Sequence, residues 1–434
     1  MTIGIVGGGI AGLIAAHDLS KAGHKVLLFE KEPDLGGQVH TFDVGGERLE
    51  GFYHHIFTSD VDIMKLIEEL NLQSKMLWID SKVGLYRDGR VYDWVTPLDL
   101  LKFRPLNIFD RVRLGLVSLY LRRYRDWQKL ERFTAREWIS KHGGKRNYEV
   151  VWGPILKNKF GPYSEDVGMV WLWGKLHLRL TSREGEKEKL GYMRGSFGLL
   201  VDALRDRITA SGGEIYTSSP VDKIVVENGK VAAIRSNGKD YPCDAVIATV
   251  PSPAFVKITP DLPSDYSSNV RVAKYMGAVV LVLTLNKSFS RFYWMNISDD
   301  KSPFVAVIEH TNFVDPSVYG GKHIVYVSNY VPVDSPLYSM SPDRLLSEYW
   351  PHLKKIAPDF NVSWIAGMNI FRDEAAQPII GKNYSSRIPA HATPIKGLYL
   401  ANTTQIYPED RGMNYSVRMG KAVAGMVGGY VLNP

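Results

Sequence analysis

The sequence predicts an α/β protein built on a doubly wound, Rossmann-like dinucleotide-binding domain. The first forty residues read as strand, glycine-rich turn, helix and strand. Apolar, β-rich runs recur in the middle and near the end of the chain. The 434 residues are 45% hydrophobic, which excludes disorder and allows about three structural units or fewer.

The first unit carries the chemistry of a dinucleotide site. A β-branched strand turns through Gly7-x-Gly9-x-x-Gly12 into a helix, and Glu30 ends the next strand. Gly7 permits a tight turn, Gly9 lets the backbone approach a pyrophosphate, and Gly12 allows close helix packing. The helix start offers N–H groups to phosphates, and the acid binds a ribose diol. The expected cofactor-binding residues of this unit are Gly7, Gly9, Ile10, Ala11, Gly12, Glu30 and Lys31.

A second glycine pair, Gly36-Gly37, follows directly. The stretch from Leu35 to Thr41 resembles the L-G-G-[RQ]-x-x-T segment of the superfamily of FAD-dependent amine oxidases, protoporphyrinogen oxidases and phytoene desaturases. In that superfamily the pair wraps the cofactor near its flavin end, so the resemblance implies FAD rather than NAD. Gln38 stands where Arg is usual, which removes a cationic contact but leaves an amide that still donates.

Two further blocks extend the resemblance. Residues 213–251 contain two strands joined by Asn228-Gly229, a strong hairpin signal. Residues 397–425 resemble the G-L-Y-x-A-G-[DE] strand and the final helix, whose N-terminus faces the flavin pyrimidine ring in the family. Ala401-Asn402 replaces the usual glycine and acid, so an amide contact is expected there. The resemblance implies further cofactor contacts from Gly36, Gly37, Gln38, Val221, Asn402, Gly412, Met413 and Asn414.

Cysteine usage limits the chemistry. The single cysteine, Cys243, excludes a disulfide framework and a cysteine-based zinc site. It lies outside the last block, so we expect non-covalent FAD. No pair of histidines has the i, i+4 spacing with an acid, so no metal site is expected.

Without a secretory signal or an apolar run of about 20 residues, a cytoplasmic protein is expected, with peripheral membrane association as an alternative.

The positions of the three blocks predict two interleaved domains. The FAD-binding domain is expected to be discontinuous, and an α+β substrate domain to cover the flavin. The predicted FAD-binding segments are 1–58, 190–255 and 385–434, and the substrate-domain segments are 59–189 and 256–384.

Local signals predict several elements of the substrate domain. Runs 276–285 and 323–327 suit central strands, and Asp88-Gly89 suits a hairpin turn. Thr134 opens a capping box for a helix that ends at Gly143-Gly144. Two other helices are expected, one capped by Ser59 with Asp62 and running to Leu70, and one capped by Ser341 that Pro351 ends or kinks.

The catalytic candidates are two adjacent histidines, His54 and His55, in an aromatic loop after the first unit. The Y-x-H-I-F portion is similar to the loop of UDP-galactopyranose mutase that carries a His at the flavin face. A nearby imidazole can donate to reduced flavin or relay a proton. The alternative is that one ring stacks in an aromatic core and the other is exposed. The segment Glu309 to Asn312 is expected to reach the substrate cavity.

Residues 101–132 hold most of the positive charge. They carry nine Lys/Arg and three Asp/Glu, against a net charge of +7 for the whole chain. On a helix, Arg111, Gly115, Ser118 and Arg122 form a narrow polar stripe, with aliphatic residues over the rest. Such a helix suits docking on an anionic membrane that delivers a lipophilic substrate, and the alternative is a core helix with solvated ends. Nucleic acid is not an expected partner, because the basic residues alternate with aliphatics.

The expected function is that of an FAD-dependent oxidoreductase. It transfers a hydride between a largely apolar substrate, at a C–C or C–N bond, and flavin N5. Simple amine oxidation is disfavoured, because the run 277–281 lacks the lysine that amine oxidases place near N5.

One alternative is a mutase-like enzyme acting on a sugar nucleotide without net redox change. Another is a non-catalytic flavin-binding membrane protein. Arginines converging on a diphosphate favour the mutase, and an apolar tunnel beside Leu114–Leu121 favours the lipid enzyme. The oligomeric state is not predicted.

Overall fold

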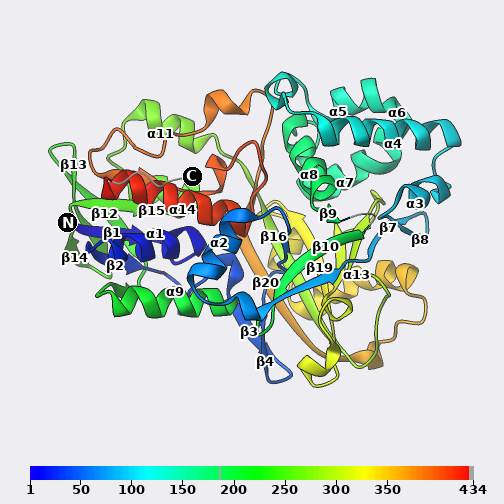
Figure 1. The fold of residues 1–434 in the computed structure, drawn as a ribbon, viewed down its shortest axis with the longest axis horizontal. Coiled ribbons are helices and arrows are strands. Elements are labelled where there is room, and N and C mark those ends of the chain that lie inside the picture. Colours follow the sequence, from blue (N-terminus) through cyan, green and yellow to red (C-terminus); the bar gives the residue numbers. More distant parts are fainter. Residues whose placement is uncertain (185–186, 430–434) are drawn as a thin grey trace.

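The computed structural model describes residues 1–184 and 187–429. Two large sheets form the body of the molecule and lie side by side (Figure 1). One is a five-stranded parallel sheet and the other a seven-stranded mixed sheet. A group of helices between residues 97 and 181 covers the seven-stranded sheet, at the upper right of the view.

The parallel sheet draws its strands from all three sequence blocks. The pairs that neighbour each other are all parallel. This confirms the predicted fold class, while the exact domain limits stay a prediction. In spatial order the strands are β11 (Glu214–Tyr216), β2 (Lys25–Phe29), β1 (Thr2–Val6), β15 (Ala245–Ala248) and β21 (Leu398–Leu400).

Both faces of the parallel sheet are covered. Helices α1 (Ile10–Lys21), α9 (Gly198–Ala210) and α14 (Met413–Gly428) pack together on one face. A three-stranded antiparallel sheet shares a buried core with the other face. Its strands are β12 (Val221–Glu227), β13 (Lys230–Ser236) and β14 (Lys239–Pro242), and the predicted Asn228-Gly229 turn joins the first two.

The seven-stranded sheet confirms both predicted central strands and the hairpin at Asp88-Gly89. In spatial order its strands are β20 (Ile365–Pro378), β16 (Tyr275–Leu285), β19 (His323–Val331), β18 (Ala306–Glu309), β17 (Trp294–Ile297), β7 (Val83–Arg87) and β8 (Arg90–Asp93). Shorter strands pair beside it. They are β3 (Thr41–Val44), β4 (Glu47–Glu50), β5 (Ile56–Phe57), β6 (Met76–Asp80), β9 (Arg183–Glu184) and β10 (Lys187–Met193).

The remaining helices lie around the two sheets, and the described ranges contain no helix that is both long and apolar enough to cross a membrane. The helices over the seven-stranded sheet are α3 (Pro97–Lys102), α4 (Ile108–Arg123), α5 (Ala135–Trp138), α6 (Lys145–Asn147), α7 (Gly153–Phe160) and α8 (Met169–Thr181). The others are α2 (Val61–Glu69), α10 (Ser252–Ile258), α11 (Ser264–Arg271), α12 (Pro336–Ser339) and α13 (Pro342–Ile356).

Helix starts and ends differ from the local predictions in two places. The capping box at Thr134 is confirmed, and Ser341 caps α13 as predicted. Pro351 does not end α13, because buried residues on both sides of it hold the helix against the sheet, and the alternative that it kinks the helix stays a prediction. The cap of α2 is Asp60 rather than Ser59, and its carboxylate accepts the N–H of Phe57.

The basic segment 101–132 is divided rather than continuous. It contains the end of α3, the whole of α4 and a 3₁₀ turn at Trp127–Leu130. Asn107 caps α4, with its side-chain oxygen accepting the N–H of Asp110 at 2.9 Å.

Candidate active site

The glycine-rich turn is tight on one side and open on the other. Gly7 has φ +106°, and a Cβ placed on Gly12 would lie 2.0 Å from the Gly7 carbonyl oxygen. A Cβ on Gly9 would meet no protein atom within 4 Å. Ile10 and Ala11 begin α1, so the first-turn N–H groups face the same opening. This geometry fits a pyrophosphate group against Gly9.

Glu30 is buried at the edge of this turn. Its Oε2 accepts the N–H of Gly8 at 2.7 Å, and its Oε1 accepts the N–H of Glu32 at 2.9 Å. The carboxylate is thereby fixed beside the glycine-rich turn, as a ribose-binding acid requires. Lys31 is exposed and pairs with Glu32 at 3.3 Å.

The second glycine pair packs directly on the first motif. The Gly36 N–H donates to the Gly8 carbonyl at 2.8 Å. Gly36 and Gly37 both have positive φ, and a Cβ on Gly37 would come within 3.2 Å of Gly9 Cα. The structure therefore brings the two predicted glycine motifs into one cradle.

The last block meets this cradle from the C-terminal end. Gly412 precedes α14, and Met413 and Asn414 begin it. All three line the same cavity as Gln38. The Asn414 side-chain oxygen accepts the N–H of Ile63 at 3.0 Å, which fixes the helix start against α2.

Two predicted cofactor residues occupy supporting positions. Val221 begins β12 and pairs with Ser236. Asn402 is buried, and both halves of its amide are engaged within the protein. Its nitrogen donates to the Val250 carbonyl and its oxygen accepts from Thr404. The contact of these two residues with a cofactor stays a prediction.

A cavity of about 580 Å³ extends from the Gln38 end of the cradle to helix α4. At the α4 end its walls are largely apolar and include Leu100, Leu114 and Leu119. At the Gln38 end they carry charge. The polar side chains there include Lys159, Lys175, Ser328, Tyr330, Asp410 and Arg411.

Both predicted catalytic histidines line the cavity. His54 Nδ1 lies 2.7 Å from the Phe52 carbonyl oxygen, so Nδ1 carries the hydrogen and Nε2 is an acceptor. Burial lowers the pKa of His54 to about 4. His55 Nδ1 lies 3.0 Å from the Tyr293 hydroxyl, and burial also lowers its pKa. Both rings are therefore neutral near pH 7. The sequence alternative of an exposed histidine is wrong, since neither is exposed.

Arg411 organises the charged end of the cavity. It donates to the Tyr330 hydroxyl at 2.6 Å, to Gln377 Oε1 at 3.2 Å and to Gln38 Oε1 at 3.1 Å. Gln38 in turn donates to Asp373 at 2.7 Å. The amide at position 38 thus lies between a cation and an anion.

Asp410 and Lys159 complete the charged end. Asp410 pairs with Lys175 at 2.7 Å, and although burial opposes it, the neighbouring cations hold the pKa of Asp410 well below its usual range. The Lys159 ammonium lies 4.5 Å from the centre of the Tyr330 ring, and burial lowers its pKa to about 8. Burial raises the pKa of Tyr330, but Arg411 and Lys159 outweigh burial and bring it to about 8.

Sequence reasoning missed Lys159, Tyr330 and Arg411. The available signal for Arg411 was its position in the sequence, directly before the predicted cofactor-binding residue Gly412. Tyr330 shares a strand face with Ser328 beyond the predicted run, and Lys159 carries no local signature.

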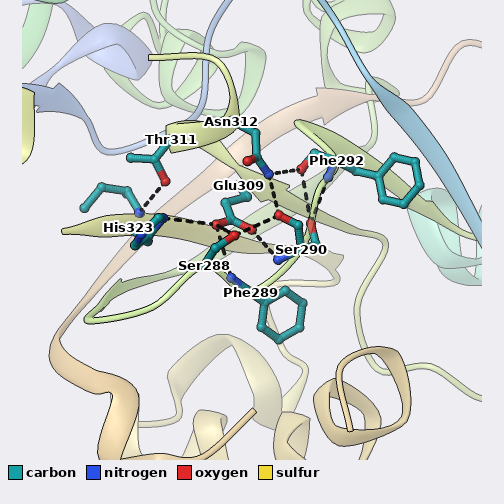
Figure 2. Close-up of polar contacts among 9 residues, drawn as sticks. Ser288, Phe289, Ser290, Phe292, Glu309, Thr311, Asn312 and His323 are labelled. Carbon is teal, nitrogen blue, oxygen red and sulfur yellow. Dashed lines mark hydrogen bonds and ion pairs between the residues drawn. The ribbon is translucent and has the colours of Figure 1, made fainter. Parts of the chain in front are cut away.

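The expectation that Glu309 reaches the cavity is wrong. Its carboxylate holds the loop before β17, accepting from Ser288 Oγ at 2.8 Å and from the N–H groups of Phe289 and Ser290 (Figure 2). Asn312 supports the same loop by donating to the carbonyls of Ser290 and Phe292, as Figure 2 shows. The cluster therefore positions β17, one wall of the cavity, from behind.

Among the described residues, one group of three side chains has metal-ligand spacing. It comprises His17, Asp18 and Glu69, away from the cavity. Lys21 and Lys421 donate to Glu69 at 2.7 and 3.3 Å, so lysine ammonium groups already neutralise this carboxylate.

Comparison with known proteins identifies the family. Residues 10–427 match the family model described as flavin-containing amine oxidoreductase. The chain is 22% identical to the chloroplastic/chromoplastic 15-cis-phytoene desaturase of Glycine max, over 98% of this chain and 79% of the relative. Its fold resembles an oxidoreductase from Methanosarcina mazei at TM-score 0.75 and 20% identity, covering 98% and 99% of the two chains. It also resembles a reduced UDP-galactopyranose mutase at TM-score 0.77 and 15% identity, covering 100% and 96%. The chain belongs to the flavin-containing amine oxidoreductase family and is an FAD-dependent oxidoreductase.

Proposed function

We propose that the protein transfers a hydride between a largely apolar substrate and non-covalently bound FAD, by dehydrogenation or saturation of a C–C or C–N bond. The observation that carries this proposal is the cavity. It joins the cradle residues Gln38 and Met413 to apolar side chains of α4. FAD, when bound, supplies the hydride acceptor or donor at N5.

The chain's own residues have three tasks in this reaction. The glycines of the cradle and Glu30 would bind the dinucleotide, and the start of α14 would stabilise negative charge on the flavin. Leu100, Leu114 and Leu119 bind the apolar part of the substrate and exclude water. The relative named as acting on 15-cis-phytoene supports a long hydrocarbon as the substrate class.

We further propose that α4 docks on an anionic membrane. Its outer face carries exposed apolar side chains, with Phe109 83% and Leu116 63% exposed. The polar stripe turns the other way, because Gly115, Ser118 and Arg122 line the cavity. Such a surface rimmed by arginines complements anionic lipids, and the cavity that α4 lines on its other side would receive a lipid-soluble substrate.

The mutase alternative has less support. Its expected feature is a set of arginines converging on a diphosphate. Arg179 instead pairs with buried Glu188 at 3.5 Å, and Arg411 is engaged by Tyr330 and the two glutamines.

An anaerobic titration tests the function. The purified flavoprotein is mixed with vesicles that contain 15-cis-phytoene, and separately, after chemical reduction, with UDP-galactose. We expect the hydrocarbon to bleach the oxidised-flavin absorbance and UDP-galactose to be returned unchanged. Isomerisation of UDP-galactose, together with no bleaching by phytoene, would show that the mutase alternative is correct.

A further inference from the structure

We propose that Tyr330 is the catalytic base that accepts the proton lost by the substrate during C–C dehydrogenation, and the acid that returns it during saturation. This inference rests on the proposed function. It adds a residue to which neither the sequence motifs nor the family match assigns a role.

The geometry places the Tyr330 oxygen at the reacting end of the cavity. Arg411 donates to Tyr330 Oη and, through its other terminal nitrogen, to Gln38. The guanidinium group of Arg411 therefore bridges the Tyr330 phenol oxygen and Gln38 of the flavin cradle. Its ring lines the cavity on β19, directly under the Lys159 ammonium.

The groups that face Tyr330 favour its ionised form. Arg411 from the segment before α14, Lys159 from α7 and Lys175 from α8 all lower its pKa, and Tyr53 lowers it further by hydrogen bonding. Asp410 is the opposing charge nearby, but Lys175 neutralises it. A phenolate between two cations is a usable base near pH 8.

Other groups in the cavity are weaker candidates. His54 presents an acceptor nitrogen, but with a pKa of about 4 it has little affinity for a proton. Asp410 is held ionised by its cations and is weaker still. Lys159 becomes a base only as a neutral amine, and the hydrogen bond from Arg411 favours the arrangement in which the charge pair is Tyr330 phenolate with Lys159 ammonium.

FAD, when bound, would be the oxidant and would take one substrate hydrogen together with its electron pair. The hydrogen on the adjacent carbon leaves as a proton to the Tyr330 oxygen, and the electrons of that C–H bond become the new π bond. The phenolate becomes a phenol and afterwards releases the proton to solvent.

A titration of tyrosine ionisation tests the proposal independently of turnover. Ultraviolet difference spectra of the purified flavoprotein are recorded between pH 6 and 10. We expect one tyrosine to ionise with a midpoint near pH 8, and Tyr330→Phe to abolish this transition. Lys159→Met, which removes a cation but keeps the side-chain volume, should shift the midpoint upward. The control Tyr326→Phe alters a buried tyrosine four residues away that lies outside the cavity lining, and should leave the transition unchanged.

Anaerobic flavin reduction by 15-cis-phytoene tests the chemical role. The wild-type rate should rise with pH through the same midpoint, and Tyr330→Phe should lower it 100-fold or more without loss of phytoene binding. The absence of any tyrosine ionising below pH 9, or a Tyr330→Phe variant that reduces flavin within threefold of wild type, would overturn the proposal. If phytoene does not reduce wild-type flavin, the proposed function fails. The ultraviolet titration then still shows whether Tyr330 ionises near pH 8, which the role of a base requires.

Discussion

Gln38 Oε1 accepts a hydrogen bond from Arg411 Nη1 at 3.1 Å, across 373 positions of sequence. Position 38 is where the resemblance to the L-G-G-[RQ]-x-x-T segment leads us to expect arginine, and this chain has glutamine there. The structure therefore returns a guanidinium group to the second glycine pair from the opposite end of the chain. The same arginine binds Tyr330, so one side chain joins the flavin cradle to the proposed base.

Exchanging these two residues should be less harmful than changing either alone. Gln38→Arg places two guanidinium groups together, and Arg411→Gln removes the cation from Tyr330. Each should lower the free energy of unfolding by about 1–3 kcal/mol. The double variant should recover at least about 1 kcal/mol of the summed loss, as measured by urea unfolding.

The control for this cycle is Arg418→Gln, because Arg418 binds Asp62 and Glu409 rather than Gln38. Combined with Gln38→Arg it should give an additive loss. Additivity in the Gln38–Arg411 pair as well would contradict the interpretation.

The two sides of the glycine-rich turn should respond differently to an added methyl group. Gly9→Ala meets open space, so the unfolding free energy of the cofactor-free protein should change by less than about 1 kcal/mol. FAD should nevertheless be retained poorly, because the methyl group occupies the phosphate side. Gly12→Ala forces a Cβ against the Gly7 carbonyl and should cost about 3 kcal/mol before any cofactor is added.

The measurements are the flavin-to-protein absorbance ratio and thermal unfolding of the deflavinated protein. A Gly9→Ala protein that keeps its full flavin content would refute the placement of the pyrophosphate.

The outer face of α4 should control membrane binding. Phe109→Ser with Leu116→Ser should reduce co-sedimentation with phosphatidylglycerol vesicles at least tenfold, because these side chains supply the exposed apolar surface. Vesicles of phosphatidylcholine should bind wild type more weakly, since the arginine contribution is electrostatic.

The matched control is Val362→Ser, a side chain that is 63% exposed but lies away from α4. It should bind vesicles like the wild type. Equal binding by the Phe109/Leu116 variant and wild type would show that α4 is not the docking surface.

Sequence reasoning located the features that short segments specify. The glycine motifs, Glu30 and the hairpins at Asp88-Gly89 and Asn228-Gly229 depend on local conformation, so their residues were readable in order. The division of the segment 101–132 was not predicted, although its signal is also local. Asn107 is a helix cap, and hydrophobic periodicity does not detect caps.

The charged end of the cavity was not readable in this way. Lys159 comes from α7, Tyr330 from β19 and Arg411 from the segment before α14, and only the packing of the two sheets brings them together. Pro351 shows the same limit for secondary structure, because long-range burial outweighs its local tendency to end a helix.

Stability should fall as pH rises from about 5 to 7, because of Glu50. This carboxyl is buried and accepts from the Tyr192 hydroxyl at 2.8 Å and the Phe197 N–H at 2.6 Å, yet burial raises its pKa from 4.5 to about 7. Between these values the folded protein holds a proton that the unfolded chain has released, so raising the pH favours unfolding, by about 1–3 kcal/mol in total. Glu50→Gln keeps an acceptor for the Phe197 N–H, presents an amide N–H to the Tyr192 oxygen in place of the carboxyl oxygen, and cannot ionise. Its unfolding free energy relative to wild type should therefore increase from pH 5 to pH 7.5 in urea titrations, and a difference that stays constant over this range would show that Glu50 is ionised throughout.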